Sequence, residues 1–151
     1  VQACAREARE RGVVFETGCG RTHFSLESAR KAFADGFLPQ IISTDQVGYT
    51  FFHRPSGWLL LKVSTYLNLG MALEDAVKAV TYTPAAVYGI LDEAGTLEEG
   101  RPADVAVFSV EDRPFSLEDL YGESLRMEKL CVPMATVKQG VPVFQQIYFG
   151  I

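Results

Sequence analysis

The sequence predicts an α/β fold, with parallel βα units over residues 1–89 and a mostly β segment over residues 90–151. In the first part, apolar patterns with the helical period alternate with short β-branched or aromatic runs, in the order helix, strand, helix, strand. This order is typical of parallel βα units. In the second part, turn signals that contain glycine separate apolar runs of strand length. We therefore expect two unlike parts in one chain.

Apolar spacing and glycine stops define the elements before residue 46. Gly12 and Gly36 each follow a helical pattern, and a glycine just after the last helical residue is a common helix end. The strands are short apolar runs. The expected elements are a helix over 2–11, a strand over 13–17, an amphipathic helix over 25–36 and a strand over 38–44.

The later elements are read in the same way. We expect Thr83 to cap a short helix, with Pro84 at its first position and Gly89 at its end. The pair Gln139-Gly140 indicates a hairpin turn. The other expected elements are an irregular aromatic loop over 46–57, a buried helix over 58–70, a helix over 72–80, a strand over 103–110 and a hairpin over 134–149.

Composition narrows the possible partners. Of 151 residues, 48% are hydrophobic and 22% charged, which is enough apolar sequence for a core. The net charge of −5 argues against nucleic acid as a partner, and the apolar runs are too short to span a membrane. The three cysteines form no Cys-x-x-Cys pair, so we expect reduced thiols and a cytoplasmic protein without a signal peptide. The chain lacks an initiator methionine, and we expect it to begin inside a longer protein.

Asp45 is the strongest single candidate for a functional residue. It ends the apolar run "IISTD", and in parallel α/β barrels the active site lies at the carboxyl ends of the strands. A carboxylate there can bind a divalent metal and accept a proton from water. The alternative is that Asp45 only caps a helix or loop.

Three further residues are weaker candidates. Cys19, in "ETGCG", is a possible zinc ligand, although a lone cysteine is commonly a small buried hydrophobe. His23 is a possible ligand or a residue at a helix start, and His53 is a possible substrate contact in the aromatic loop. No Gly-x-Ser-x-Gly elbow or phosphate-binding loop is present. "GCGRTH" offers only slight support for a nucleotide-binding domain.

The ordered segments resemble the C-terminal part of an amidohydrolase-superfamily enzyme, in the branch of dihydroorotase-like amidohydrolase/deacetylase metallohydrolases. "GTLEEGRPADVAVFSV" is similar to the Gly-x-(Leu/Ile)-x-x-Gly-x-x-Ala-Asp-(Leu/Val) segment of that superfamily. "LNLGMALEDAVKAVTYTPAAVYGI" resembles the helix pair before it, "FLPQIISTD" the last barrel strand, and "LCVPMATVKQGVPVF" the closing strands of a small β-sandwich.

The resemblance implies the last βα units of a TIM-barrel-type metallohydrolase over 1–89 and part of a composite β-sandwich over 90–151. It implies hydrolysis of amide or cyclic amide C–N bonds by metal-activated water, with zinc the expected ion. Asp45 matches the aspartate that binds the metal and shuttles the proton. A small-molecule amide is the expected substrate, and a homo-oligomer the expected assembly.

Two departures from the family pattern affect this prediction. Cys19 stands where the branch has a histidine that looks like a metal ligand, and His23, four residues later, could replace it. The His-x-His motif and the bridging lysine of the superfamily are missing from this chain. We therefore expect the isolated chain to be inactive. The alternative is a non-catalytic, truncated homologue that acts through oligomeric assembly.

Overall fold

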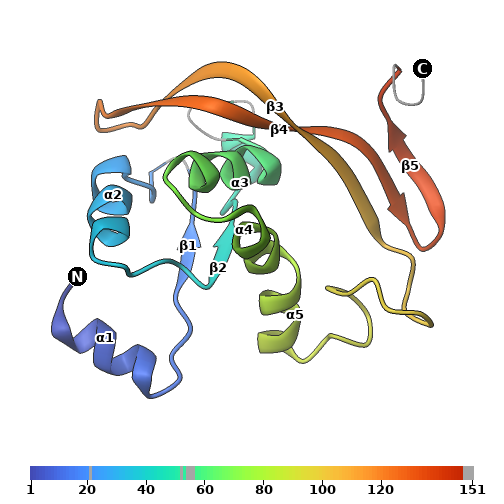
Figure 1. Cartoon of the computed structure of the whole chain (residues 1–151), viewed down its shortest axis with the longest axis horizontal. Coiled ribbons are helices and arrows are strands. Elements are labelled where there is room, and N and C mark those ends of the chain that lie inside the picture. Colours follow the sequence, from blue (N-terminus) through green and yellow to red (C-terminus); the bar gives the residue numbers. More distant parts are fainter. Residues whose placement is uncertain (21, 52, 54–56, 148–151) are drawn as a thin grey trace.

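The computed structural model describes residues 1–20, 22–51, 53 and 57–147. Helices and two parallel strands precede Gly89, and three antiparallel strands follow it (Figure 1). The elements are α1 (Ala3–Glu10), β1 (Glu16–Gly18), α2 (Leu26–Ala34), β2 (Ile41–Ser43), the 3₁₀ turn η1 (Gly48–Thr50), α3 (Leu59–Asn68), α4 (Leu73–Val80), α5 (Tyr82–Tyr88), β3 (Val105–Glu118), β4 (Ser124–Lys138) and β5 (Val141–Gln145).

β1, α2 and β2 form one parallel βα unit. The strands pair from Glu16 with Ile41 to Gly18 with Ser43. The crossover helix α2 is capped by Ser25, whose hydroxyl accepts the Ser28 N–H at 3.3 Å. This cap satisfies one of the free N–H groups of the first turn. The predicted order of helix, strand, helix and strand is confirmed for this part of the chain.

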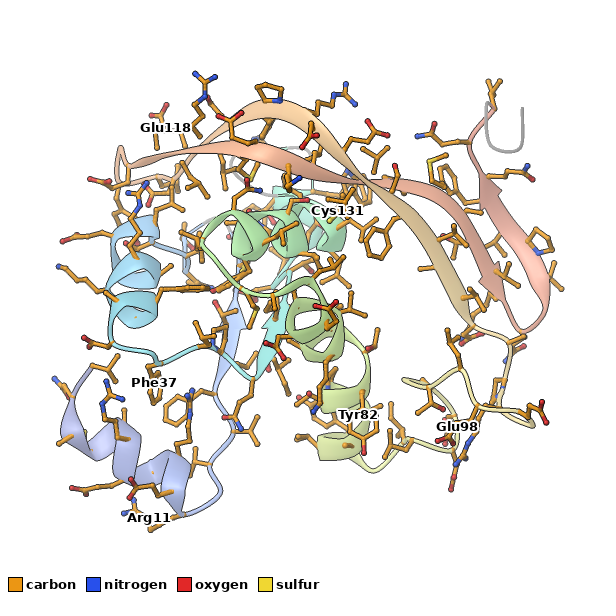
Figure 2. All side chains as sticks on the ribbon, viewed as in Figure 1. Arg11, Phe37, Tyr82, Glu98, Glu118 and Cys131 are labelled. Atoms are coloured by element: carbon orange, nitrogen blue, oxygen red, sulfur yellow. The ribbon has the colours of Figure 1, made fainter. Side chains whose placement is uncertain are left out.

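α1 is attached to the βα unit by stacking. The guanidinium of Arg9 lies 3.5 Å from the centre of the Phe37 ring, and its Nη2 donates to the Leu38 carbonyl at 2.7 Å. Phe37 also makes an edge contact with Phe15 at a ring distance of 5.0 Å. Figure 2 labels Phe37 between α1 and the rest of the unit.

β3 and β4 form a long hairpin that lies across α3 and reaches α2 (Figure 1). The predicted strand over 103–110 and hairpin turn at Gln139-Gly140 are confirmed, although residues 148 and 149 of that hairpin lie outside the described residues. The extension of both strands, over residues 111–118 and 124–129, was not predicted, because charged residues interrupt its apolar pattern. Its buried face, which includes Leu117 and Met127, explains why it forms.

Two apolar clusters form the core. One lies between β2, α3, α4 and β4, and Asn68 and Ser64 of α3 hydrogen-bond to the β4 backbone above it. Cys131, labelled in Figure 2, belongs to this cluster. The second cluster joins α2 to the far end of the hairpin through Leu26, Leu117, Leu125 and Met127.

The last helix before the β part of the chain is α5. α5 begins after Thr81, not Thr83, so Pro84 is the third helical residue; Gly89 ends the helix with φ 70°, as predicted. Within the described ranges, every helix is too short or too polar to cross a membrane.

Candidate functional site

Asp45 lies two residues beyond the carboxyl end of β2, in a backbone conformation that few side chains adopt. Its φ is 46°, in the left-handed region, where Asp is tolerated better than most residues. Gly18 and Gly20 of the neighbouring strand end lie against it. A Cβ placed on Gly20 would come within 2.5 Å of Asp45 Oδ2, and one on Gly18 within 3.3 Å of Asp45 Cβ. The carboxylate therefore occupies space that only glycines leave open.

His23 meets Asp45 from the other strand of the pair. Because β1 and β2 are parallel, the loops that follow them leave the same edge of the sheet, and His23 is in the first loop while Asp45 is in the second. His23 Nδ1 is in hydrogen-bonding contact with Asp45 Oδ2. The imidazole is 69% exposed and the carboxylate 37%. An Nδ1–H that donates to a carboxylate fixes the ring tautomer and leaves Nε2 able to bind a metal.

Cys19 is placed elsewhere. Its side chain is only 1% exposed and belongs to the main apolar cluster. Its Sγ lies 3.8 Å from Thr17 Oγ1, and Thr17 Oγ1 in turn accepts a hydrogen bond from the Tyr66 hydroxyl at 2.8 Å. Burial raises the pKa of the Cys19 thiol, which the charge of Lys62 only partly opposes. Burial therefore disfavours the thiolate that a metal requires.

The structure thus brings together two of the three predicted ligands. In the parts of the chain that the structure describes, no three His, Cys, Asp or Glu side chains form a group that could hold a metal, so Cys19, His23 and Asp45 do not make a three-ligand site. A role for Cys19 as a ligand stays a prediction that its contacts do not favour. His53 is exposed, its backbone N–H donates to the Thr50 carbonyl, and its predicted role in substrate binding is untested.

Lys62 is a polar residue near the site that the sequence analysis did not single out. It is 4% exposed, and burial lowers its pKa. Together with Cys19, Gly20 and Asp119 it lines a cavity of about 10 Å³, which is close to the space of one water molecule. A lysine inside the apolar run "WLLLKV" was the signal that could have identified it.

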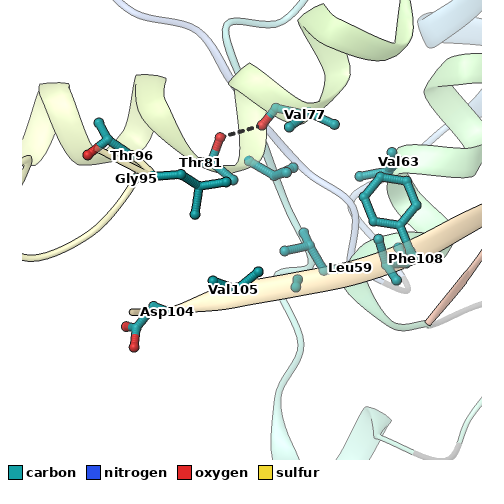
Figure 3. Close-up of a pocket in the computed structure, with 13 residues that line it drawn as sticks. Leu59, Val63, Val77, Thr81, Gly95, Thr96, Asp104, Val105 and Phe108 are labelled. Carbon is teal, nitrogen blue, oxygen red and sulfur yellow. Dashed lines mark hydrogen bonds between the residues drawn. The ribbon is translucent and has the colours of Figure 1, made fainter. Parts of the chain in front are cut away.

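A larger groove of about 530 Å³ lies away from His23 and Asp45. Figure 3 shows it between α3, the end of α4 and the start of β3. Its lining is mainly aliphatic and includes Leu59, Val77 and Phe108. This lining has no counterpart to the imidazole–carboxylate pair, so we place the candidate site at the strand ends.

Comparison with known proteins agrees with the fold and with the segments singled out in the sequence. Residues 4–141 match the amidohydrolase family model. A deacetylase of Agrobacterium fabrum is 35% identical over 136 residues, covering 90% of this chain and 32% of the relative. A dihydroorotase of Syntrophotalea carbinolica is 32% identical over 117 residues, covering 69% of this chain and 27% of the relative.

Solved structures give the same result. An adenine deaminase superposes with a TM-score of 0.90 at 25% identity, over 97% of this chain and 39% of that one. A dihydroorotase superposes with a TM-score of 0.82 at 31% identity, over 96% and 39%. This chain spans about a third of the length of the curated relatives named here. Over nearly all of its own length, it belongs to the amidohydrolase family.

Proposed function

We propose that this chain supplies one part of the active site of a metal-dependent hydrolase of C–N bonds, in amides or cyclic amides. The observation that carries the proposal is the contact between His23 and Asp45 at the ends of two parallel strands. The relatives named deacetylase, dihydroorotase and adenine deaminase support hydrolysis of C–N bonds as the class of reaction. In this proposal, β1 and β2 are strands of a barrel and β3–β5 are part of a sandwich.

The two side chains fit a divalent metal in chemical type. Imidazole nitrogen and carboxylate oxygen are ordinary zinc ligands, and Gly18 and Gly20 leave the Asp45 side chain the space that it occupies. Such an ion, when bound, supplies Lewis acidity toward the carbonyl oxygen and toward water. Because Nδ1 of His23 is engaged by Asp45, only Nε2, on the opposite side of the ring, is left to bind a metal, and Asp45 would support that ligand through the Nδ1–H. We propose that the other ligands belong to regions that the relatives have outside the matched segment.

Asp45 is the proposed proton carrier. Its carboxylate would accept a proton from the attacking water and deliver it to the leaving nitrogen, which is general base and then general acid catalysis. His23, held against the same carboxylate, orients it and contributes a donor nitrogen. Because most ligands are missing from this chain, we expect the isolated chain to hydrolyse no amide.

A grafted enzyme tests the proposal. The matching segment of the Agrobacterium fabrum deacetylase would be replaced by this chain, and hydrolysis of an N-acetyl amide would be measured with zinc bound. We expect Asp45→Asn to lower kcat by roughly 10²- to 10⁴-fold. Asp75→Asn, an exposed residue of α4, is the matched control and should leave kcat unchanged. Equal activity of the two variants would refute the assignment of Asp45.

A second candidate function is assembly without catalysis. Val141 and Val143 of β5 are 60% and 61% exposed, on a strand at one edge of its sheet. Exposed apolar edges favour association between chains. A stable oligomer that binds no zinc when zinc is supplied would support this candidate over the hydrolase, because self-association alone is expected of both.

A further inference from the structure

The end of the β3–β4 hairpin lies beside the loop that carries His23. We call residues 119–123, between Glu118 of β3 and Ser124 of β4, the hairpin tip. They are about 100 residues away from His23 in the sequence, yet they bond to the chain on both sides of it. This connection joins the β part of the chain to the candidate site.

Asp119 makes the hydrogen bond on the C-terminal side of His23. Its Oδ2 accepts the N–H of Leu26, the first residue of α2, at 2.8 Å. Its Oδ1 accepts the N–H groups of Tyr121 and Glu123 at 2.8 and 3.0 Å, which closes the tip on itself. The side chain is 6% exposed. Although burial raises it, these three donors hold the pKa of Asp119 below its ordinary value.

Tyr121 makes the hydrogen bond on the N-terminal side of His23. Its hydroxyl donates to the carbonyl of Thr22, the residue before His23, at 2.9 Å. Further along α2, Arg30 donates to the Glu123 carboxylate at 2.9 Å and to the Ser124 carbonyl at 2.5 Å. Three separate polar contacts therefore fix residues 22–30 to the hairpin tip.

Apolar packing reinforces these bonds. Phe24, the residue after His23, packs against the cluster of Leu26, Leu117, Leu125 and Met127. Leu26 and Met127 are fully buried. Both neighbours of His23 are thus held by the hairpin, while the imidazole itself is exposed and contacts Asp45.

We propose that the hairpin tip is the positioning element for the candidate site, with Asp119 and Tyr121 as positioning residues that hold His23 against Asp45. The inference rests on the proposed function, which gives the His23–Asp45 pair its chemistry. Displacing a functional group by about 1 Å can lower a rate by roughly 100-fold, so a loop that carries a ligand needs such support. The tip supplies it from outside the βα unit.

The test measures the tautomer of the His23 ring. Long-range ¹H–¹⁵N NMR spectra of the purified, metal-free chain at about pH 8, where histidines are ordinarily neutral, show which ring nitrogen carries the proton. We expect the Nδ1–H tautomer in the wild-type chain, because Nδ1 faces the carboxylate. Tyr121→Phe removes only one hydroxyl and should change the ratio of the two tautomers about fivefold toward Nε2–H.

Tyr88→Phe is the matched control, because Tyr88 is a similarly exposed tyrosine on α5. It should leave the tautomer ratio unchanged. Asp119→Asn, in samples whose amide spectrum shows a folded chain, should change the ratio at least as much as Tyr121→Phe. An unchanged ratio in Tyr121→Phe overturns the inference, whether or not Asp119→Asn folds.

The positioning role of the hairpin tip and the proposed function are tested by two different measurements. The tautomer is measured without metal or substrate, whereas the role of Asp45 is measured by hydrolysis in the grafted deacetylase. A changed tautomer together with an active Asp45→Asn enzyme would support the positioning role and refute the catalytic one. The opposite pair of results would refute only the positioning role.

Discussion

Gly20 shows how one missing side chain shapes the candidate site. Its φ is not positive, so its backbone would accept other residues, and the constraint is space. A Cβ there would lie 2.5 Å from Asp45 Oδ2 and 3.1 Å from the Asp45 carbonyl oxygen. The carboxylate could move away, but only by leaving its place beside His23. Gly20 is therefore part of the geometry that holds the pair.

We expect Gly20→Ala to separate His23 from Asp45 at a cost of roughly 1–3 kcal/mol in the free energy of unfolding, because it overpacks a close contact. In the grafted deacetylase, kcat should fall by about 100-fold. Urea unfolding and steady-state kinetics measure the two effects. Gly48→Ala is the control, since a Cβ there meets nothing within 4 Å. Equal kinetics for both variants would show that Asp45 tolerates the added methyl.

Asp119, at the end of the β3–β4 hairpin, should make the free energy of unfolding depend on pH in the acid range. The folded pKa of Asp119 is lowered, so below the ordinary Asp pKa of about 3.9 the unfolded chain binds the proton more readily than the folded one. The contribution of Asp119 to stability is thus complete above about pH 4 and is lost as pH falls through the folded pKa.

Asp119→Asn should remove the contribution that Asp119 makes to the loss of stability in acid. The free energy of unfolding, measured by urea titration from about pH 6 to pH 2, should fall less steeply in the variant than in the wild type. Asp104 also has a lowered pKa, because Lys138 and the Gln139 N–H bond to its carboxylate, and so Asp104→Asn serves as a comparison far from the tip. Parallel acid limbs for Asp119→Asn and the wild type would contradict the prediction.

The same hairpin depends on Asn68 at the end of α3. The Asn68 side chain accepts the N–H groups of Glu128 and Lys129 and donates to the Lys129 carbonyl at 2.7 Å. Asn68→Ala should destabilise the fold by about 1–3 kcal/mol, because it removes three hydrogen bonds between α3 and the β4 backbone. Gln46→Ala, which removes a single bond in an exposed loop, should cost less than half as much. Urea unfolding followed by circular dichroism compares the two.

Along the whole chain, the structural features that the sequence predicts are those that depend on local pattern. The helices, the parallel strand order, the Gly89 helix end and the Gln139-Gly140 turn follow from spacing and turn chemistry, and the structure has them. Asp45 and His23 could be singled out because of their residue types. Their contact could not, because it depends on the parallel pairing of β1 and β2 and on the space beside Gly20.

The hairpin tip was missed for a related reason. Residues 111–118 and 124–129 alternate poorly, and their pairing with each other and their contacts with α2 and α3 stabilise them as strands. The burial of Cys19 is also a long-range effect, since its neighbours Tyr66 and Lys62 come from α3. Sequence spacing alone does not show which side of a strand end faces the core.

Association is the property that the exposed strand β5 should control. Val141, Val143 and Phe144 are exposed on an edge strand, and covering such apolar area is favourable. We expect the purified chain to self-associate, with a mass that rises with concentration in sedimentation experiments. Val143→Lys should shift the chain toward the monomer, because pairing would bury an uncompensated charge. Val87→Lys, on exposed α5, is the control and should leave the mass distribution unchanged. If both variants sediment like the wild type, association does not use β5.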